Sequence, residues 1–386
     1  MSAASASDVY QINLQQQFGG GEVYTRFFTL ALIELGYRAV LFVSRKADYW
    51  DTLLPAGVEI IRVDGAADIK RLLPQERSLV VTQTALDAAD AQWVAGRHVL
   101  CGFVHMPLYE RDPPGFKHYR HLLVVSQYVL DSVKSRGYGS IYAEPMYGVA
   151  DPARNAPNLT LARRSEYDWD RRKLRDRLLG LTEPLWRMNL AAVEFSKRPG
   201  LTLGIVSRLT PIKQFPLMFG VLAPVIAKYP QVNLEIFGSG GYASVRDLRA
   251  SLAPMSQQTR FWGHQANVAA VYPQLDYVLS GLPEKEALGL NLIEAQYCGT
   301  PVLAVHAPPF TETVIDGASG FLFTDPRADG GEFFEHLLQR LLAGAARPDP
   351  RQAAAHLARF SFAAFRGRVA RALAAIADAH VAGMHA

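Results

Sequence analysis

The sequence predicts an α/β protein with two doubly wound parallel sheets. Short apolar runs alternate with helical stretches along most of the chain, which is typical of parallel strands covered by helices. Glycine turns follow several of these runs, as expected where a strand turns into a helix. The length of 386 residues exceeds one ordinary core and suits two domains.

The expected strands and helices follow from apolar runs and stop signals. In the first half we expect strands at Asp8 to Leu14, Ala39 to Val43, Val58 to Val63, Leu79 to Thr82, Val99 to Val104 and Leu122 to Ser126. In the second half we expect strands at Leu201 to Ser207, Leu234 to Phe237, Tyr277 to Leu279 and Val302 to Val305. The main expected helices are Val23 to Leu35, Gln127 to Arg136, one starting near Leu290 and ending at Gly299, and Phe362 to Val381.

Composition bounds the class of protein and its surroundings. With 49% hydrophobic and 20% charged residues, the chain is expected to be folded and soluble. A net charge of +4 favours small acidic substrates or an anionic membrane surface over nucleic acid. Cys101 and Cys298 stand alone, which argues against structural zinc and a disulfide framework. Because no leader or membrane span is recognisable, we expect a cytoplasmic protein.

The most informative stretch for chemistry contains Glu286 and Glu294, with Gly289 between them. A helix beginning at Leu290 would offer its free amides and the positive end of its dipole to an anion. Gly289, Leu290 and Asn291 could therefore hold a diphosphate. The same pattern also suits a strand-helix-strand unit without a ligand, since acidic residues stabilise any helix start.

Two further turns carry groups that suit an anion. Arg208 and Lys213 lie five positions apart after an expected strand, so both could reach one diphosphate; two exposed loop cations would look the same. Gly19 and Gly20 precede an expected helix and could approach a phosphate, although such glycines also serve tight turns without ligands.

His105 follows a strand of the first half, at the sheet edge where ligands of such sheets bind. This position suits acid–base or hydrogen-bonding work, although a lone histidine is more often structural. The basic and aromatic loop after it, with Arg111 and Lys117, could receive an anionic or sugar acceptor. A solvated loop explains that composition equally well.

A rival hypothesis comes from the turn that begins at Gly238. Its sequence spells G-x-G-x-x-A after a strand, which is the fingerprint of dinucleotide binding and would indicate a nicotinamide-dependent oxidoreductase. The fingerprint requires an acidic residue about 20 positions further on. The chain has Arg260 to His264 there, without an acid.

The segment E-A-L-G-L-N-L-I-E, followed by G-T-P-V at Gly299 to Val302, resembles the E-x7-E signature of retaining GT-B glycosyltransferases, family 4 in particular. The resemblance runs from the Gly19 loop to Gly320 and is strongest over residues 201–322. It departs from the family at Leu288, where phenylalanine is usual, and at Ser207 and Gln214, where glycine is usual.

The resemblance implies a GT-B fold, in which two Rossmann-like doubly wound domains face each other across a cleft. We expect an acceptor-side domain over residues 1–198, including an interdomain region of about 151–198 with one charged helix near Arg171 to Leu179. A nucleotide-sugar-binding domain should follow over 199–361. The helix of residues 362–386 should then pack back on the first domain.

The resemblance also implies roles for individual residues. It assigns catalysis to Glu286, His105, Arg208 and Lys213, and the donor diphosphate to Arg208, Lys213, Gly289, Leu290, Gly19 and Gly20. It assigns the ribose to Glu294, the base to Gly238, Gly263 and His264, and the acceptor to Arg111 and Lys117. No metal or cofactor is expected.

The implied activity is transfer of a sugar from a UDP- or GDP-sugar to a hydroxyl of a glycan, glycolipid or small acceptor, with retention of configuration. The expected setting is bacterial surface polysaccharide, lipopolysaccharide or glycolipid assembly, in the cytoplasm or peripherally at an anionic membrane, without nucleic acid. A GT-B isomerase of sugar nucleotides or a non-catalytic sugar-nucleotide binder remains an alternative. The sequence determines neither base, sugar, acceptor nor oligomeric state.

Overall fold

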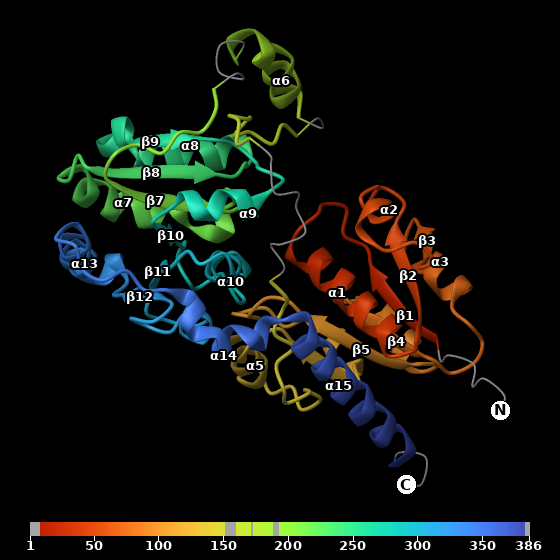
Figure 1. The fold of residues 1–386 in the computed structure, drawn as a ribbon. Coiled ribbons are helices and arrows are strands. Elements are labelled where there is room, and N and C mark those ends of the chain that lie inside the picture. Colours follow the sequence, from red (N-terminus) through yellow and green to blue (C-terminus); the bar gives the residue numbers. More distant parts are fainter. Residues whose placement is uncertain (1–7, 151–159, 171–172, 188–192, 383–386) are drawn as a thin grey trace. The chain divides into compact units, whose positions relative to one another are not determined.

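The chain forms two compact units, Met1–Val149 with Ala358–Ala386, and Ala150–Leu357 (Figure 1). The computed structural model describes residues 8–150, 160–170, 173–187 and 193–382. Each unit contains one six-stranded sheet, and all strand pairs within the two sheets are parallel. The predicted fold class, two doubly wound α/β domains, is confirmed.

The first unit orders its strands β3-β2-β1-β4-β5-β6. These strands are β1 (Asp8–Asn13), β2 (Arg38–Ser44), β3 (Glu59–Val63), β4 (Leu79–Thr82), β5 (Val99–Val104) and β6 (His121–Val124). Its α-helices are α1 (Gly20–Glu34), α2 (Trp50–Leu53), α3 (Ala66–Leu72), α4 (Ala88–Ala95), α5 (Gln127–Lys134) and α15 (Phe362–Ala382). From β1 the chain adds strands first on one side, as β2 and β3, and then on the other side, as β4, β5 and β6, so the strand order reverses between β1 and β4.

The second unit orders its strands β12-β11-β10-β7-β8-β9, with the reversal between β7 and β10. The strands are β7 (Leu201–Val206), β8 (Val232–Phe237), β9 (Thr259–Phe261), β10 (Tyr277–Leu279), β11 (Val302–Val305) and β12 (Gly320–Phe323). The α-helices are α6 (Leu174–Arg187), α7 (Phe215–Ala227), α8 (Tyr242–Ser251), α9 (Val268–Val271), α10 (Leu290–Tyr297), α11 (Phe310–Thr313), α12 (Pro326–Asp329), α13 (Glu332–Leu342) and α14 (Ala354–Leu357).

Element boundaries differ from the expected ones where side chains cap helices or glycines enter them. Helix α1 begins at Gly20 rather than Val23, so the glycine turn forms its first turn. Strand β6 ends before Ser126 because the Ser126 side chain caps α5, accepting a hydrogen bond from the Val129 amide at 3.1 Å. The charged helix runs to Arg187, well beyond the expected end, while Arg171 lies outside the described residues.

The segment between the sheets groups with the second unit, whereas the sequence predicts residues 151–198 to be part of the first domain. Its backbone explains why. The Arg164 amide donates to the Trp262 carbonyl at 2.9 Å, and the Gly240 amide donates to the Glu166 carbonyl at 2.9 Å. The segment therefore satisfies its backbone groups against the β9 side of the second sheet. Residues 151–159 lie outside the described part of the chain.

Helix α15 belongs to the first unit although it follows the second unit in the sequence. Arg366 forms an ion pair with Glu34 of α1 at 2.6 Å, and Arg371 forms one with Glu144 at 2.6 Å. Among the described residues, no helix is long and apolar enough to cross a membrane.

The turn that begins at Gly238 packs tightly against the turn after β7. A Cβ atom on Gly238 would lie 1.8 Å from the Ser207 carbonyl oxygen, and one on Gly240 would lie 2.0 Å from that of Leu209. The Leu209 amide also donates to the Ser239 carbonyl at 2.7 Å. Close packing of the chain on itself thus accounts for both glycines of the apparent dinucleotide fingerprint.

This packing predicts opposite effects for two glycine substitutions in the second unit. Gly238→Ala should lower the free energy of unfolding by about 1–3 kcal/mol, because the methyl group meets backbone that must move. Gly220→Ala lies within α7, where an added methyl group would enter open space, and should raise the free energy of unfolding by about 0.5–1 kcal/mol. Urea unfolding measures both. Equal stability of Gly238→Ala and wild type would contradict the packing argument.

Candidate active site

The candidate site lies at the reversal of the second sheet, between β7 and β10. These strands are neighbours, with Leu203 opposite Tyr277. Helix α10 starts beside the end of β7, because the Asn291 side-chain amide donates to the Val206 carbonyl at 3.2 Å. Ligands of open α/β sheets bind at such reversals, outside the carboxyl ends of the strands.

An ion pair joins the two loops at this reversal. Lys213 ends the short 3-10 helix Pro211–Lys213 after β7, and its Nζ lies 2.5 Å from Glu286 Oε1 in the loop after β10. The two side chains are 21% and 9% exposed, so the pair is largely withdrawn from water. The loops also touch through backbone, since the Leu282 amide donates to the Lys213 carbonyl at 3.3 Å. Removing one partner would leave the other charge unpaired in a poorly hydrated place.

Gln214 follows Lys213 and adopts the left-handed conformation, with φ of 53°. The family that the sequence resembles usually has glycine here, so the expected backbone shape persists despite the substitution. The Gln214 carbonyl accepts hydrogen bonds from the Leu217 and Met218 amides at 3.1 and 3.2 Å. The residue thus starts α7 at a conformational cost of about 1–2 kcal/mol.

The start of α10 has the geometry expected of an anion site. Gly289, with φ of 78°, precedes the helix, and no side chain caps it. The first-turn amides of Leu290 and Asn291 belong to the group of N–H donors that a helix does not satisfy itself. Together with the helix dipole, they favour a phosphate oxygen at this end.

Glu294 lies on the second turn of α10, where a buried tyrosine holds it. The Tyr272 hydroxyl donates to Glu294 Oε2 at 3.0 Å. Burial, reinforced by the Glu294 charge, raises the pKa of Tyr272 well above its ordinary value, so the tyrosine stays a proton donor. Glu294 is therefore a fixed acceptor beside the α10 start, suited to sugar hydroxyls.

The remaining predicted donor residues of this unit lie in different settings. Arg208 is exposed directly after β7, in the same turn as Lys213. Gly263 is buried, with φ of 67°, and its Cβ position lies 2.3 Å from the Ser165 carbonyl oxygen, so the chain itself covers it. His264 is exposed. The base-binding roles of Gly238, Gly263 and His264 stay predictions.

In the first unit, polar groups gather at the reversal between β1 and β4. His105 Nε2 lies 2.9 Å from Gln83 Oε1 at the end of β4, and the Gly21 Cβ position lies 3.8 Å from the His105 ring. Glu22, buried in the first turn of α1, accepts a hydrogen bond from Asn13 Nδ2 at 3.3 Å. Gly19 and Gly20 thus start the helix beside this cluster, as its cap and first residue.

The His105 ring packs between Phe103 and Tyr24, with centroids at 5.6 and 5.1 Å. Burial lowers the pKa of His105 to about 4. The ring is therefore neutral near pH 7, and as placed its Nε2 donates to the Gln83 oxygen. A neutral histidine held in this way is suited to hydrogen bonding with a hydroxyl.

The predicted acceptor residues Arg111 and Lys117 are exposed in the loop after β5. Arg111 Nη2 donates to the Pro107 carbonyl at 2.9 Å, which orients that side chain within its own loop. The acceptor role of both residues stays a prediction.

Sequence reasoning missed Gln83 and Tyr272, and for Asn291 it predicted a backbone role at the diphosphate but not the side-chain contact with Val206. Gln83 had a readable signal, because a polar residue directly after a buried strand lies at the ligand-binding edge of the sheet. Tyr272 and Asn291 act through neighbours distant in sequence, and no spacing rule indicates such contacts.

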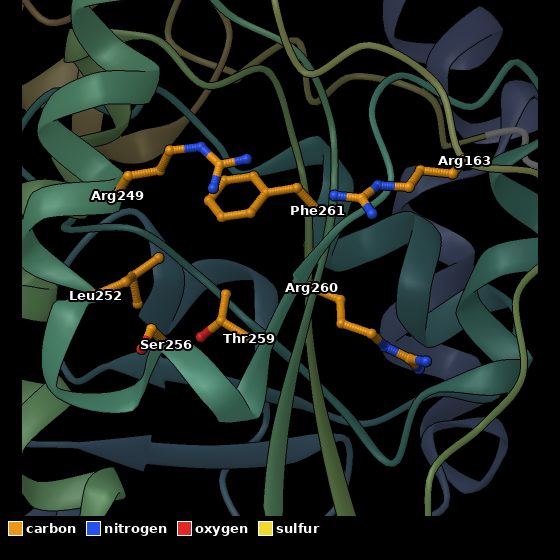
Figure 2. A pocket seen from close by; sticks show the side chains of 7 residues that line it. All are labelled: Arg163, Arg249, Leu252, Ser256, Thr259, Arg260 and Phe261. Atoms are coloured by element: carbon orange, nitrogen blue, oxygen red, sulfur yellow. The ribbon is translucent and has the colours of Figure 1, made fainter. Parts of the chain in front are cut away.

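A cavity of about 200 Å³ lies elsewhere in this unit, at edge strand β9 (Figure 2). It is lined by Arg163, Arg249, Leu252, Ser256, Thr259, Arg260 and Phe261. Arg249 pairs with Glu166 at 2.5 Å and Arg260 with Glu235 at 2.6 Å. Because Arg249 and Arg260 have carboxylate partners and the sheet does not reverse here, we place the candidate active site at β7 and β10 instead.

Within the described residues, no group of three or more His, Cys, Asp or Glu side chains could hold a metal.

Comparison with known proteins gives a family match within the second half of the chain. Residues 191–354 match the family model "Glycosyl transferases group 1". The D-inositol 3-phosphate glycosyltransferase of Segniliparus rotundus is 32% identical over 127 residues, covering 31% of this chain and 28% of the relative. A GDP-mannose-dependent monoacylated alpha-(1-6)-phosphatidylinositol monomannoside mannosyltransferase of Corynebacterium glutamicum is 33% identical over 116 residues, covering 28% and 30%. The chain thus spans less than a third of the length of these two relatives.

Whole-chain similarity is seen in structure. The crystal structure of Anabaena HepE in complex with UDP superposes with a TM-score of 0.67 at 17% identity, covering 96% of this chain and 100% of HepE. At this identity the likeness shows the fold alone. The chain therefore has a GT-B fold, and the match to the family model falls on residues 191–354.

The neutral state of His105 predicts a specific pH dependence of stability. As the pH falls below the ordinary histidine value of 6.5, the unfolded chain binds the proton first, so the His105 contribution to stability is lost between pH 6.5 and about 4. Wild type should lose more unfolding free energy between pH 7 and 5 than His105→Gln, measured by urea unfolding. Parallel losses in the two proteins would show that His105 is not held neutral.

Proposed function

We propose that the protein transfers a sugar from a nucleotide diphosphate sugar to an acceptor hydroxyl, with retention of anomeric configuration. The observation that carries this proposal is the Lys213–Glu286 pair beside the uncapped start of α10. A cation, free amides and carboxylates thereby meet at the reversal of the second sheet. This set matches the parts of a sugar nucleotide, which has an anionic diphosphate and two hydroxyl-bearing rings.

The difficult event in such a transfer is departure of the nucleoside diphosphate from the anomeric carbon. Arg208, Lys213 and the amides of Leu290 and Asn291 would stabilise the charge that develops on the leaving diphosphate. Glu286 would orient donor hydroxyls and, through its ion pair, Lys213. We infer attack by the acceptor on the face from which the diphosphate leaves.

The other assigned residues would bind the substrates and would not stabilise the charge on the leaving diphosphate. Glu294, fixed by Tyr272, would hold the ribose. In the first unit, neutral His105 would bind a sugar or acceptor hydroxyl, and Gly19 and Gly20 would lie near the donor phosphate. Because cations and amides would neutralise the diphosphate, we propose that the reaction needs no metal.

The names of the relatives suggest which donors and acceptors this protein could use. One is named GDP-mannose-dependent, and HepE was crystallised with UDP, so we propose a UDP- or GDP-sugar as donor. The relatives' names include D-inositol 3-phosphate and a monoacylated phosphatidylinositol monomannoside. We accordingly propose a phosphate-bearing or lipid-linked acceptor in bacterial surface glycan or glycolipid assembly, with the protein at the cytoplasmic side of the membrane.

A GT-B isomerase or a non-catalytic sugar-nucleotide binder would use the same diphosphate site. Product analysis separates these alternatives. Transfer releases free nucleoside diphosphate and joins the sugar to an acceptor, an isomerase leaves the altered sugar on its nucleotide, and a binder does neither. A nicotinamide-dependent oxidoreductase is not proposed, because chain packing accounts for Gly238 and Gly240.

The test is turnover of UDP- and GDP-sugars with inositol phosphate or bacterial lipid extract as acceptor, followed by release of nucleoside diphosphate. Lys213→Ala should reduce turnover by on the order of 10² or more, if Lys213 stabilises the leaving group. Lys228→Ala removes a surface pair with Glu335 in the same unit and should retain turnover. EDTA should leave wild-type turnover unchanged.

Near-normal turnover of Lys213→Ala would remove Lys213 from the diphosphate site. Loss of wild-type turnover in EDTA, restored by a divalent cation, would contradict the metal-free proposal. If nucleoside diphosphate is released but no acceptor gains a sugar, the reaction is hydrolysis of the donor and not transfer.

A further inference from the structure

Helix α6 exposes a row of four leucines. Leu174, Leu178, Leu181 and Leu185 are 70%, 57%, 75% and 74% exposed. Their spacing of four, three and four residues, at about 100° per residue, places them within an arc of about 60° on one side of the helix. A contiguous apolar row of this kind differs from single exposed leucines, which need no explanation.

The opposite side of α6 attaches the helix to its own unit. Asp176 is 2% exposed on that side, and a Cβ atom on Gly180 would lie 3.1 Å from Trp169 Cγ. The Trp169 indole nitrogen donates to Glu183, and the Trp169 ring stacks on Tyr167 with centroids 4.8 Å apart. The helix is therefore held by its polar side, and the leucine row contributes little to its attachment.

Figure 1 shows α6 outside the helices that flank the sheet of the second unit. Arg175 contributes to its attachment by lying over the Tyr242 ring at 4.5 Å. The leucine row points away from the contacts of Asp176 and Gly180, since these residues lie on the other side of the helix.

The charged residues that flank the leucine row are basic, and two of them have carboxylate partners: Lys173 pairs with Asp170 at 3.8 Å and Arg175 with Asp176 at 2.7 Å. On the helical wheel Arg175 and Arg177 flank the row on its two sides, and Lys173 lies near Arg177 at the helix start. The two acidic residues of the helix, Asp176 and Glu183, face inward to the attachment. Residues 173–187 contain four basic and two acidic residues, a net charge of +2.

This distribution distinguishes two possible occupants. A second copy of α6 would meet the row with the same basic flanks, and the acidic residues within the described helix, Asp176 and Glu183, face inward and not toward the row. An anionic lipid surface would accept the leucines among its acyl chains and the basic side chains at its phosphates. Charge complementarity therefore favours the lipid surface.

We propose that the leucine row of α6 docks the protein on a bilayer containing anionic phospholipid, with the helix lying in the interface. A short helix with four leucines and a few cations gives reversible binding that depends on lipid charge and salt. This inference rests on α6 alone and does not depend on the donor site.

Co-sedimentation with vesicles tests the proposal, using phosphatidylcholine with and without about 40% phosphatidylglycerol, whose anionic headgroups give the surface a negative potential. Wild type should bind the anionic vesicles and bind them less at higher salt. Leu178→Ser combined with Leu181→Ser should weaken this binding by about tenfold or more, since two of four inserting leucines are lost. Leu217→Ser is the matched control, because Leu217 is 55% exposed on α7 of the same unit.

A charge variant, Lys173→Glu with Arg177→Glu, should lose the preference for anionic vesicles. Thermal unfolding confirms that each variant is folded. Equal vesicle binding by wild type and the leucine variant would overturn the proposal, as would absence of wild-type binding. A wild-type dimer in solution that the leucine variant converts to monomer would assign the row to a second copy instead.

Discussion

Reversal of the second sheet between β7 and β10 is the constraint on which the candidate site depends. Parallel strands bring their carboxyl ends to one edge, and the reversal sends the loops after β7 and β10 in opposite directions, leaving room between them. Lys213 comes from one loop and Glu286 from the other, and their contact at 2.5 Å joins the two. The start of α10 lies at the same place because Asn291 binds the end of β7.

Most of the fold could be predicted from sequence because buried parallel strands are continuous apolar runs with sharp ends. Leu79 to Thr82, Val99 to Val104, Tyr277 to Leu279 and Val302 to Val305 have the predicted bounds. Helix α10 starts at Leu290 as predicted, because Gly289 supplies the left-handed residue before it. Where Gln214 replaces the usual glycine, the backbone is left-handed all the same, so the surrounding chain determines its conformation.

The features that could not be predicted from the sequence depend on contacts between residues that are distant in the chain. The Lys213–Glu286 pair and the His105–Gln83 contact join loops that only the sheet topology brings together. Residues 160–170 lack periodicity, so nothing in their pattern showed that they pair with the edge of the second sheet. The leucine row of α6 is periodic and could have been recognised, but whether such a row is buried or exposed depends on the packing partner.

The central claim is that a nucleoside diphosphate binds between the turn after β7 and the start of α10. Amide NMR of ¹⁵N-labelled protein titrated with UDP and with GDP tests it most directly. The account predicts saturable shifts, with one of the two, that are largest at Leu290, Asn291 and Lys213. Largest shifts around Gly238 to Gly241, or around Arg163 and Arg260 at the edge of the sheet, would contradict it.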